Sequence, residues 1–221
     1  MTFSKEWNGI YQKNLQINNW PFTDLISLVM NNFNLKKRNL KILELGSGSG
    51  PNIPFFLSLK MEYFGIDGSQ SIINKLKKKY PKLKNNLIAC DFTSEIPFEN
   101  KFDLIIDRSS LTHNSTIDIK RCLELIEKKL NKNGKYFGLD WFSTNHFEFK
   151  NGSKSQDSFT KHNFKRGQFE KIGNVHFSNK PHMLKLFKNF KIEILNEKII
   201  NNKIPVKNNN IAFWNIVAKK K

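Results

Sequence analysis

The sequence has few cysteines and no long apolar segment. Its two cysteines, Cys90 and Cys122, are too few for a disulfide framework, and we interpret both as core thiols of a reduced, cytoplasmic protein. No apolar run approaches the length of a membrane span, and the first seven residues, Met-Thr-Phe-Ser-Lys-Glu-Trp, lack the pattern of a secretory signal peptide. We therefore expect that the protein is not a disulfide-rich secreted protein and that it does not bind to or span a membrane.

Arginine is also scarce, although the chain is strongly basic. The net charge is +18, yet only four arginines occur among the 37 basic residues, so lysine supplies almost all of the excess. The planar guanidinium group is favoured for bidentate recognition of phosphates and bases. A lysine-dominated charge therefore makes nucleic acid an unlikely partner. We expect the positive field to attract an acidic or phosphorylated small molecule instead.

An apolar stretch followed by three alternating glycines is the most informative part of the sequence. Residues 42–45 predict a buried strand, and the glycines from Gly46 to Gly50 predict a loop in which the backbone can approach a ligand. Pro51 fits the first turn of a helix, and it stands where a dinucleotide-binding loop needs its last glycine. The carboxylate of Glu44, just before the loop, favours an amine-bearing or cationic ligand over a pyrophosphate.

This loop resembles motif I of the class I methyltransferases that use S-adenosylmethionine, and further similarities follow in the same order over residues 40–140. Asp67, at the end of the next predicted strand, is similar to the acid that holds both ribose hydroxyls, because a carboxylate can accept two hydrogen bonds. Asp91 and Phe92 resemble the pair that contacts the adenine amino group and packs against the ring. The resemblance implies S-adenosylmethionine as cofactor, with a binding site formed by Glu44, Gly46, Ser47, Gly48, Asp67, Gly68, Asp91, Phe92 and Asp107.

Strands alternate with helical segments from residue 40 to residue 140, which is typical of a parallel sheet with helices on both faces. We expect an α/β, Rossmann-like, seven-stranded, mostly parallel sheet whose last strand is antiparallel, as the resemblance implies. The predicted strands lie near 41–45, 62–66, 86–90, 102–106, 134–140, 190–199 and 211–218, with a helix near 181–189. The Asn-rich residues 207–210 suit a hairpin between the last two strands.

We expect residues 1–221 to form a single methyltransferase domain with two additions. Residues 1–38 are predicted to form an N-terminal helical lid, with Trp7 and Tyr11 one helical turn apart and able to close over the bound molecules. Ordinary packing of these rings against the core is the alternative. Residues 141–180 have no sustained period and follow the fifth strand, so we interpret them as an inserted substrate cap.

Catalytic residues are expected where the fourth and fifth strands end. Methyl transfer from a sulfonium is an in-line displacement, so the protein has to align the reactants and in some cases remove a proton. The candidates are His113, Asp140 and Asp107. His113 has a pKa range suited to a general base, although a surface or helix-capping role is the alternative. Asp140 contacts the substrate or, alternatively, serves as a helix cap or a loop hydrogen-bond partner.

Substrate-binding candidates are Trp7, Tyr11, Arg108, His146 and His162. Arg108 can hold an anionic substrate, and Asp107 can orient either the donor or the acceptor. Alternatively, these two residues form an ion pair that fixes the loop. His146 and His162 belong to the predicted cap, where one histidine can serve as a base or as a substrate ligand. The histidine spacings match no zinc or iron signature, so we predict no metal.

The resulting hypothesis is methyl transfer from S-adenosylmethionine to a small polar or anionic acceptor. O-methylation of a sugar or of another surface-polysaccharide precursor is the specific reaction that we favour. An RNA methyltransferase and a non-catalytic cofactor-binding subunit remain alternatives. An oxidoreductase that uses a nicotinamide cofactor is a further one, but Pro51 and Glu44 argue against it.

Overall fold

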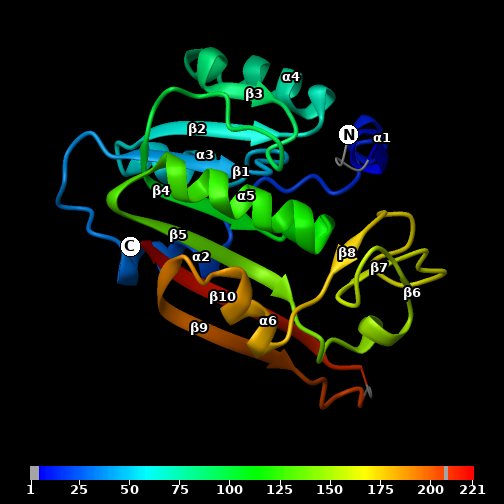
Figure 1. Cartoon of the computed structure of the whole chain (residues 1–221). Helices are drawn as coiled ribbons and strands as arrows, with labels where there is room; N and C mark the ends of the chain where they lie inside the picture. The colour runs from blue at the N-terminus through cyan, green and yellow to red at the C-terminus, as the bar shows by residue number, and fades with distance from the viewer. Residues whose placement is uncertain (1–4, 207–208) are drawn as a thin grey trace.

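The computed structural model describes residues 5–206 and 209–221 (Figure 1). Seven strands form one sheet in the order β3-β2-β1-β4-β5-β10-β9, in which β10 runs antiparallel to both of its neighbours. This arrangement confirms the predicted fold class. The strands are β1 (Lys41–Leu45), β2 (Glu62–Asp67), β3 (Leu87–Ala89), β4 (Phe102–Arg108), β5 (Leu130–Phe142), β9 (Phe190–Ile200) and β10 (Ile211–Lys220).

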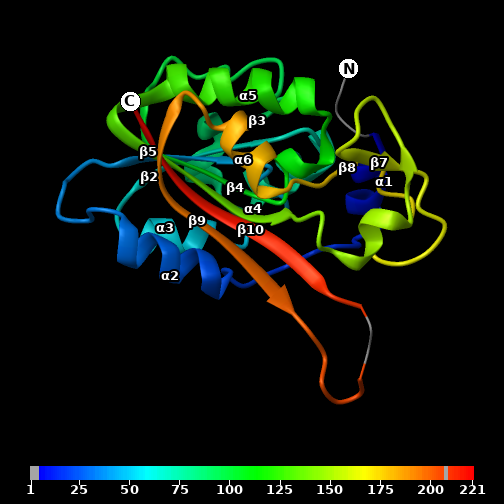
Figure 2. The same ribbon diagram turned by 60° about the horizontal axis from the view of Figure 1, so that its bottom comes forward.

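Helices cover both faces of the sheet, because the central strands are apolar on both sides. One core lies under α5 (Thr116–Lys129) and α6 (Lys180–Leu186). The other lies under α1 (Lys5–Gln12), α2 (Thr23–Asn32), α3 (Ile53–Ser58) and α4 (Gln70–Lys79). Figure 2 shows α5 and α6 on one side of the sheet and α2 and α3 on the other. Short 3-10 helices lie at η1 (Pro81–Asn86), η2 (Leu111–His113) and η3 (Phe147–Lys150).

The helix α5 illustrates how the sequence pattern produces this packing. Its buried apolar side chains, Ile119, Cys122, Leu123 and Ile126, are spaced three and four residues apart and therefore share one face. The hydroxyl of Ser115 caps the helix by accepting a hydrogen bond from the backbone N–H of Asp118. Of the two predicted core thiols, Cys122 is buried here, whereas Cys90 is only partly buried.

The region predicted as a helical lid contains two helices, α1 and α2, but residues 13–22 between them and residues 33–38 after them are not helical. The connection is attached to the glycine loop. The backbone N–H of Asn18 donates to Ser49 Oγ at 3.0 Å, and the Ser49 hydroxyl donates to the Asn18 carbonyl at 2.6 Å. The N–H of Phe22 donates to Asn52 Oδ1 at 3.3 Å.

Residues 143–179, the greater part of the predicted cap, form a small unit beyond the end of β5 (Figure 1). It contains the antiparallel strands β6 (Ser153–Lys154), β7 (Thr160–His162) and β8 (Val175–His176). Its apolar core is formed by Phe142, Phe164, Phe169, Ile172, Val175 and Phe177. Contacts between aromatic side chains therefore stabilise this segment, which has little regular secondary structure.

The β9–β10 pair projects from the body of the protein (Figure 2). Its antiparallel register agrees with the predicted hairpin, but residues 207 and 208 of the predicted turn lie outside the described residues. Within residues 5–206 and 209–221, no helix has both the length and the apolar character needed to cross a membrane.

A chain of hydrogen bonds fixes the tautomers of two buried histidines. The Thr160 hydroxyl donates to Asp157 Oδ2 at 2.9 Å, so it must accept its second bond, at 3.1 Å, from Nδ1–H of His176. His176 Nε2 then carries a lone pair, and His182 Nε2–H donates to it at 3.2 Å. Asp157 also accepts the N–H of Thr116, so this chain of bonds ties residues 157–182 to the start of α5.

Replacing His182 with glutamine is expected to make stability less sensitive to acid. Burial, together with Lys120 and Lys185 against the opposing effect of Asp157, lowers the pKa of His182 from 6.5 to about 4. Below pH 6.5 the unfolded chain takes up a proton that the native chain excludes, which costs about 1.4 kcal/mol per pH unit until the native pKa is reached. Between pH 6.5 and 5.5, the free energy of unfolding measured by urea denaturation should therefore fall by about 1 kcal/mol less in the variant, since the unfolded histidine is already half-protonated at pH 6.5. Equal losses in the two proteins would contradict this role.

Candidate functional site

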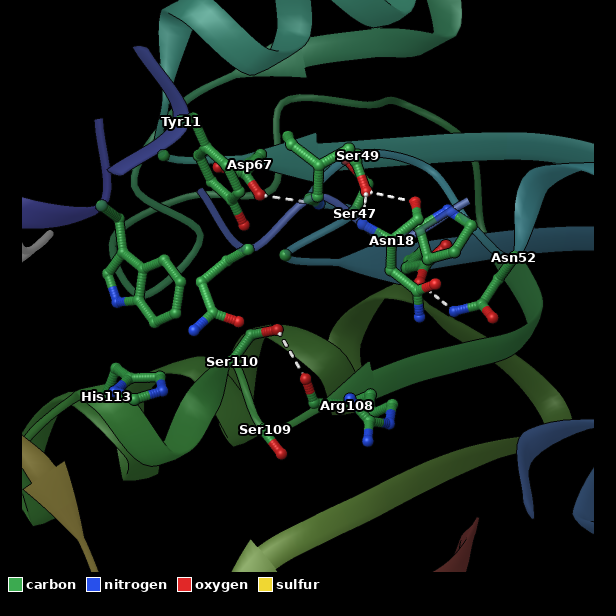
Figure 3. A pocket seen from close by; sticks show the side chains of 18 of the residues that line it. Tyr11, Asn18, Ser47, Ser49, Asn52, Asp67, Arg108, Ser109, Ser110 and His113 are labelled. Carbon is green, nitrogen blue, oxygen red and sulfur yellow. Dashed lines mark hydrogen bonds between the residues drawn. The ribbon is translucent and has the colours of Figure 1, made fainter. Parts of the chain in front are cut away.

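A cavity of about 340 Å³ lies where β1, β2 and β4 end, and the N-terminal segment closes its other side. Ligands of open α/β sheets bind at this edge of the strands. Figure 3 shows Tyr11 and Asp67 on one side of the cavity, opposite Arg108, Ser109, Ser110 and His113. The lining residues are Trp7, Tyr11, Gln16, Ile17, Asn18, Phe22, Glu44, Gly46, Ser47, Gly48, Ser49, Pro51, Asn52, Asp67, Gly68, Phe92, Arg108, Ser109, Ser110, His113 and Asn114.

The glycine loop turns back over the end of β2 and packs against the turn that follows β4. The N–H groups of Gly46 and Ser47 both donate to the Ile66 carbonyl, at 2.7 and 3.0 Å. Gly46 has φ +70°, and a methyl group at this position would overlap the side chain of Ser110. The hydroxyl of Ser110 in turn donates to the Leu45 carbonyl at 3.0 Å. Gly46 therefore supplies both the backbone conformation and the space for this contact.

Glu44 lines the cavity but is almost completely buried. Its carboxylate accepts hydrogen bonds from Asn52 Nδ2 at 2.8 Å and from the Tyr63 hydroxyl at 2.5 Å. Burial raises the pKa of Glu44 to about 7, despite the opposing effect of these two donors. A bound cation or amine would favour the ionised form. The preference of this carboxylate for such a ligand stays a prediction.

Asp67 points its carboxylate at the glycine loop. Oδ2 accepts the N–H of Gly48 and Oδ1 accepts the N–H of Ser69, both at 2.9 Å. Each carboxylate oxygen has a second lone pair, so the side chain can still accept two hydroxyl groups side by side. Burial raises the pKa of Asp67 to about 6, against the lowering effect of the two backbone donors.

Of the other predicted cofactor-binding residues, Ser47, Gly48, Gly68 and Phe92 also line the cavity. Asp91 is not among the lining residues. Its Oδ1 accepts the backbone N–H and the hydroxyl of Thr93, at 2.9 and 2.6 Å, so it holds the loop from which Phe92 projects. Contact between Asp91 and an adenine amino group stays a prediction.

Asp107 is fully buried beneath the cavity and is not one of its lining residues. Its Oδ1 accepts the N–H groups of Ser110 and Leu111, at 2.9 and 3.0 Å. Its Oδ2 accepts Trp141 Nε1–H at 2.7 Å. Burial raises its pKa to about 6, against these donors. The structure thus uses Asp107 to hold the turn after β4 and does not bring it to the candidate reaction centre.

The alternative in which Asp107 and Arg108 form an ion pair is wrong. Arg108 Nη2 lies 2.6 Å from Asp140 Oδ2, so the partner comes from the neighbouring strand. The cause is the direction of the side chains. Successive residues of a strand point to opposite faces, which separates Asp107 from Arg108. Asp140 is not among the lining residues, but its carboxylate pairs with Arg108 and its carbonyl accepts the hydroxyl of Ser109, and both of these residues line the cavity.

His113 lines the cavity at the end of η2, with its ring centroid 5.0 Å from that of Trp7 in an edge-on contact. Its Nδ1 lies 3.2 Å from the carbonyl oxygen of Asn174. Because a carbonyl can only accept, Nδ1 carries the proton and Nε2 carries the lone pair. Burial lowers the pKa of His113 to about 4, so the imidazole is neutral near pH 7 and able to accept a proton.

The tautomer of His113 can be measured without a substrate. In ¹⁵N-histidine-labelled protein, we expect a protonated Nδ1 and an unprotonated Nε2 for His113, unchanged between pH 8 and about pH 5 because the pKa is about 4. The His113→Gln variant identifies the resonance by its disappearance. A protonated Nε2, or titration near pH 6.5, would show that the carbonyl of Asn174 does not hold the ring in this state.

The two histidines predicted to bind the substrate from the cap, His146 and His162, do not line the cavity. None of the cavity-lining residues belongs to residues 141–180. His146 is buried among aromatic rings of this segment, where its Nε2 lies 2.7 Å from Gln168 Nε2. His162 lies on β7, paired in register with Ser153. The structure therefore does not bring His146 or His162 to the cavity, although Trp7 and Tyr11, the other two aromatic candidates, both reach it.

Several lining residues were not predicted from the sequence, notably Asn18, Phe22, Ser49, Asn52 and Ser110. Ser49 lies in the glycine loop and Asn52 directly before α3, so their closeness to the motif in the sequence could have identified them. Asn18 and Phe22 reach the site through contacts with residues about 30 positions away, which no sequence motif indicates. Among the described residues, no group of three or more His, Cys, Asp and Glu side chains could hold a metal ion.

Comparison with known proteins gives a consistent result. Residues 42–134 match a family model described as a methyltransferase domain, whereas no curated protein matches the chain. A methyltransferase structure from Methanosarcina mazei, described as S-adenosylmethionine-dependent, is 16% identical with a TM-score of 0.67 and covers 87% of this chain and 96% of its own. One from Anabaena variabilis is 16% identical with a TM-score of 0.65, covering 99% and 93%.

A third solved structure concerns the conversion of a disulfide bond into a thioacetal group during echinomycin biosynthesis. It is 13% identical to this chain with a TM-score of 0.68, and the alignment covers 99% of this chain and 93% of that one. At these identities the three structures show a shared fold. The domain match covers the glycine loop, the end of β2 and the turn after β4.

Proposed function

Because the chain is a class I methyltransferase that uses S-adenosylmethionine, we propose that it transfers the methyl group to a small polar or anionic acceptor. The domain match and the fold confirm the predicted family, enzyme class and cofactor. The acceptor is the proposed part. One observation carries it: the glycine loop and Asp67 share a cavity with Arg108 and His113, so a donor and a small acceptor can meet in one enclosed space.

The donor half of the cavity is assigned to β1, β2 and the loop between β1 and α3. Glu44 and the loop backbone are suited to the amino-acid part of the donor, and Asp67 to the two ribose hydroxyls. Phe92 offers an apolar surface for the adenine ring. The activated sulfonium needs no further chemistry from the protein. Alignment of the methyl carbon with the acceptor atom supplies the main rate effect.

The acceptor half is assigned to the turn after β4 and to the N-terminal segment. His113, with its lone pair on Nε2, is suited to take the proton from a hydroxyl as the methyl group arrives. A hydroxyl acceptor such as a sugar or a surface-polysaccharide precursor fits this role. Residues 1–38 act as the lid in this proposal, because Trp7, Tyr11 and Phe22 form one wall of the cavity. Residues 141–180 support His113 from outside the cavity, because the carbonyl of Asn174 accepts the hydrogen bond from its Nδ1.

Calorimetry and a transfer assay test the proposal together. S-adenosylhomocysteine is expected to bind with micromolar affinity, and methyl-labelled donor is expected to modify members of a panel of small hydroxyl compounds. Absence of S-adenosylhomocysteine binding would contradict the donor site. Binding without transfer to any small acceptor would favour a non-catalytic subunit. Tight RNA binding that persists near physiological salt would favour an RNA methyltransferase, because non-specific contacts are lost as salt increases.

A further inference from the structure

Arg108 is held at the cavity wall by contacts on two sides. Its guanidinium carbon lies 3.5 Å from the centroid of the Phe22 ring, and its Nη2 lies 2.6 Å from Asp140 Oδ2. Both contacts are themselves fixed by hydrogen bonds. The N–H of Phe22 donates to Asn52 Oδ1, and the N–H of Asp140 donates to Asn215 Oδ1. The guanidinium therefore has a defined position before any ligand arrives, which lowers the entropic cost of binding.

The guanidinium also keeps donors for a ligand. Its side chain is 32% exposed and lines the cavity. In the part of the chain that the structure describes, Asp140 is its one ion-pair partner, through Nη2. Arginine has five N–H donors in a planar fork, so this pair leaves donors free to engage a second planar anion.

The charges around the cavity limit the kind of anion. Arg108 is the one lysine or arginine among the lining residues that the structure describes, and Glu44 and Asp67 contribute two acids. Asp140 already balances the charge of Arg108. A dianionic phosphate would bring two negative charges to this single cation, whereas a carboxylate brings one. The planar shape of a carboxylate also matches the fork of the guanidinium.

We propose that Arg108, placed by Phe22 and Asp140, binds a carboxylate of the methyl acceptor, so that the substrates are small carboxylic acids. The assignment rests on the proposed function, since it needs the cavity to hold an acceptor beside the donor. It narrows that function from polar or anionic compounds to one chemical class. The strong positive charge of the whole chain then serves to attract the acid, and Arg108 to select it.

The probes for the test are small carboxylic acids, each paired with its neutral amide of the same shape. Binding is measured by ligand-observed NMR in the presence of saturating S-adenosylhomocysteine, and phosphate monoesters form a third set. We expect the unmodified protein to bind its preferred acids at least tenfold more tightly than the paired amides, since charge-assisted pairs are strong. We also expect acids to bind more tightly than phosphate monoesters.

Four variants locate the preference. Arg108→Gln should abolish the difference between acids and amides, and Arg108→Lys should restore only part of it, because an ammonium cannot form the planar pair. Asp140→Asn should increase acid binding severalfold, because the competing charge is removed while the asparagine amide oxygen can still accept a hydrogen bond that keeps Arg108 in place. This increase is a readout that a purely structural role for Asp140 would not produce. The matched control is Arg166→Gln, at an exposed arginine that does not line the cavity, which should leave all affinities unchanged.

Each outcome decides the proposal. Equal binding of acids and amides, absence of acid binding, or preference for phosphate monoesters would overturn it. A tenfold loss of S-adenosylhomocysteine affinity in Arg108→Gln would also overturn it, because Arg108 would then hold the carboxylate of the donor. If the unmodified protein does not bind S-adenosylhomocysteine at all, the proposed function fails. Normal binding of S-adenosylhomocysteine without acid preference means that only the carboxylate assignment fails.

Discussion

Alanine at position 67 is expected to weaken the binding of S-adenosylhomocysteine by at least tenfold. The side chain can accept both ribose hydroxyls while its two oxygens still accept the N–H groups of Gly48 and Ser69. Hydrogen bonds to a charged group contribute about 1.5–3 kcal/mol each, so the loss of one alone predicts about a tenfold effect or more. Isothermal titration calorimetry measures the change, and thermal unfolding of the variant checks that the loop remains folded.

The same residue predicts the pH dependence of donor binding. Burial raises the pKa of Asp67 to about 6, and only the ionised carboxylate accepts both hydroxyls. Affinity is therefore highest well above pH 6 and falls as the pH decreases, by about tenfold at pH 5 from this group. Glu44, with a pKa of about 7, faces the same cavity and adds its own dependence. Comparison with Asp67→Asn isolates the contribution of Asp67, and identical pH profiles for the two proteins would contradict it.

Replacing Gly46 with alanine is expected to lower the free energy of unfolding by about 2–5 kcal/mol. The left-handed backbone at φ +70° costs a residue with a Cβ roughly 1–2 kcal/mol, and the overlap with the Ser110 side chain adds about 1–3 kcal/mol. In a chain of this size the loss corresponds to a melting temperature lower by roughly 4–20 °C. Urea and thermal denaturation give both numbers.

Two further proteins serve as controls for this prediction. Gly9→Ala adds the same methyl group within α1, where no heavy atom lies within 4 Å, and should be neutral or stabilising because alanine favours helices. The double variant Gly46→Ala with Ser110→Gly removes the overlap and should recover only the steric part of the loss. A Gly46→Ala protein as stable as Gly9→Ala would show that the loop relaxes without cost.

Most of the sheet and half of the site could be predicted from the sequence, because both depend on local patterns. The predicted strand at 41–45 coincides with β1, and the other predicted strands overlap the observed ones, since apolar runs bounded by turn residues define them. That the glycine loop and Asp67 lie close together could also be predicted, because each follows the end of a predicted parallel strand. Parallel strands connected by right-handed crossovers place their carboxyl ends at one edge.

The rest of the site depends on contacts between distant residues. The pairing of Arg108 with Asp140 follows from the register of β4 and β5, which the sequence does not encode at those two positions. Residues 141–180 lack a period, so their place after the fifth strand suggested a cap. In the structure the aromatic residues of this segment pack with one another, and the ring of His146 packs against Phe169 of that core and does not line the cavity. Asp107 was predicted to bind the cofactor and to take part in catalysis, but it does not line the cavity. A sequence does not distinguish an acid that holds a buried turn from one that binds a ligand.

The bond between Asn174 and His113 joins two parts of the chain that are 61 residues apart. A substitution in residues 141–180 that moves this carbonyl would therefore change the basicity of an imidazole in the cavity wall, although no residue of that segment lines the cavity. Trp7, another wall residue, also packs against the apolar core of the same segment, so changes far from the reacting atoms can influence both proton removal and the shape of the cavity.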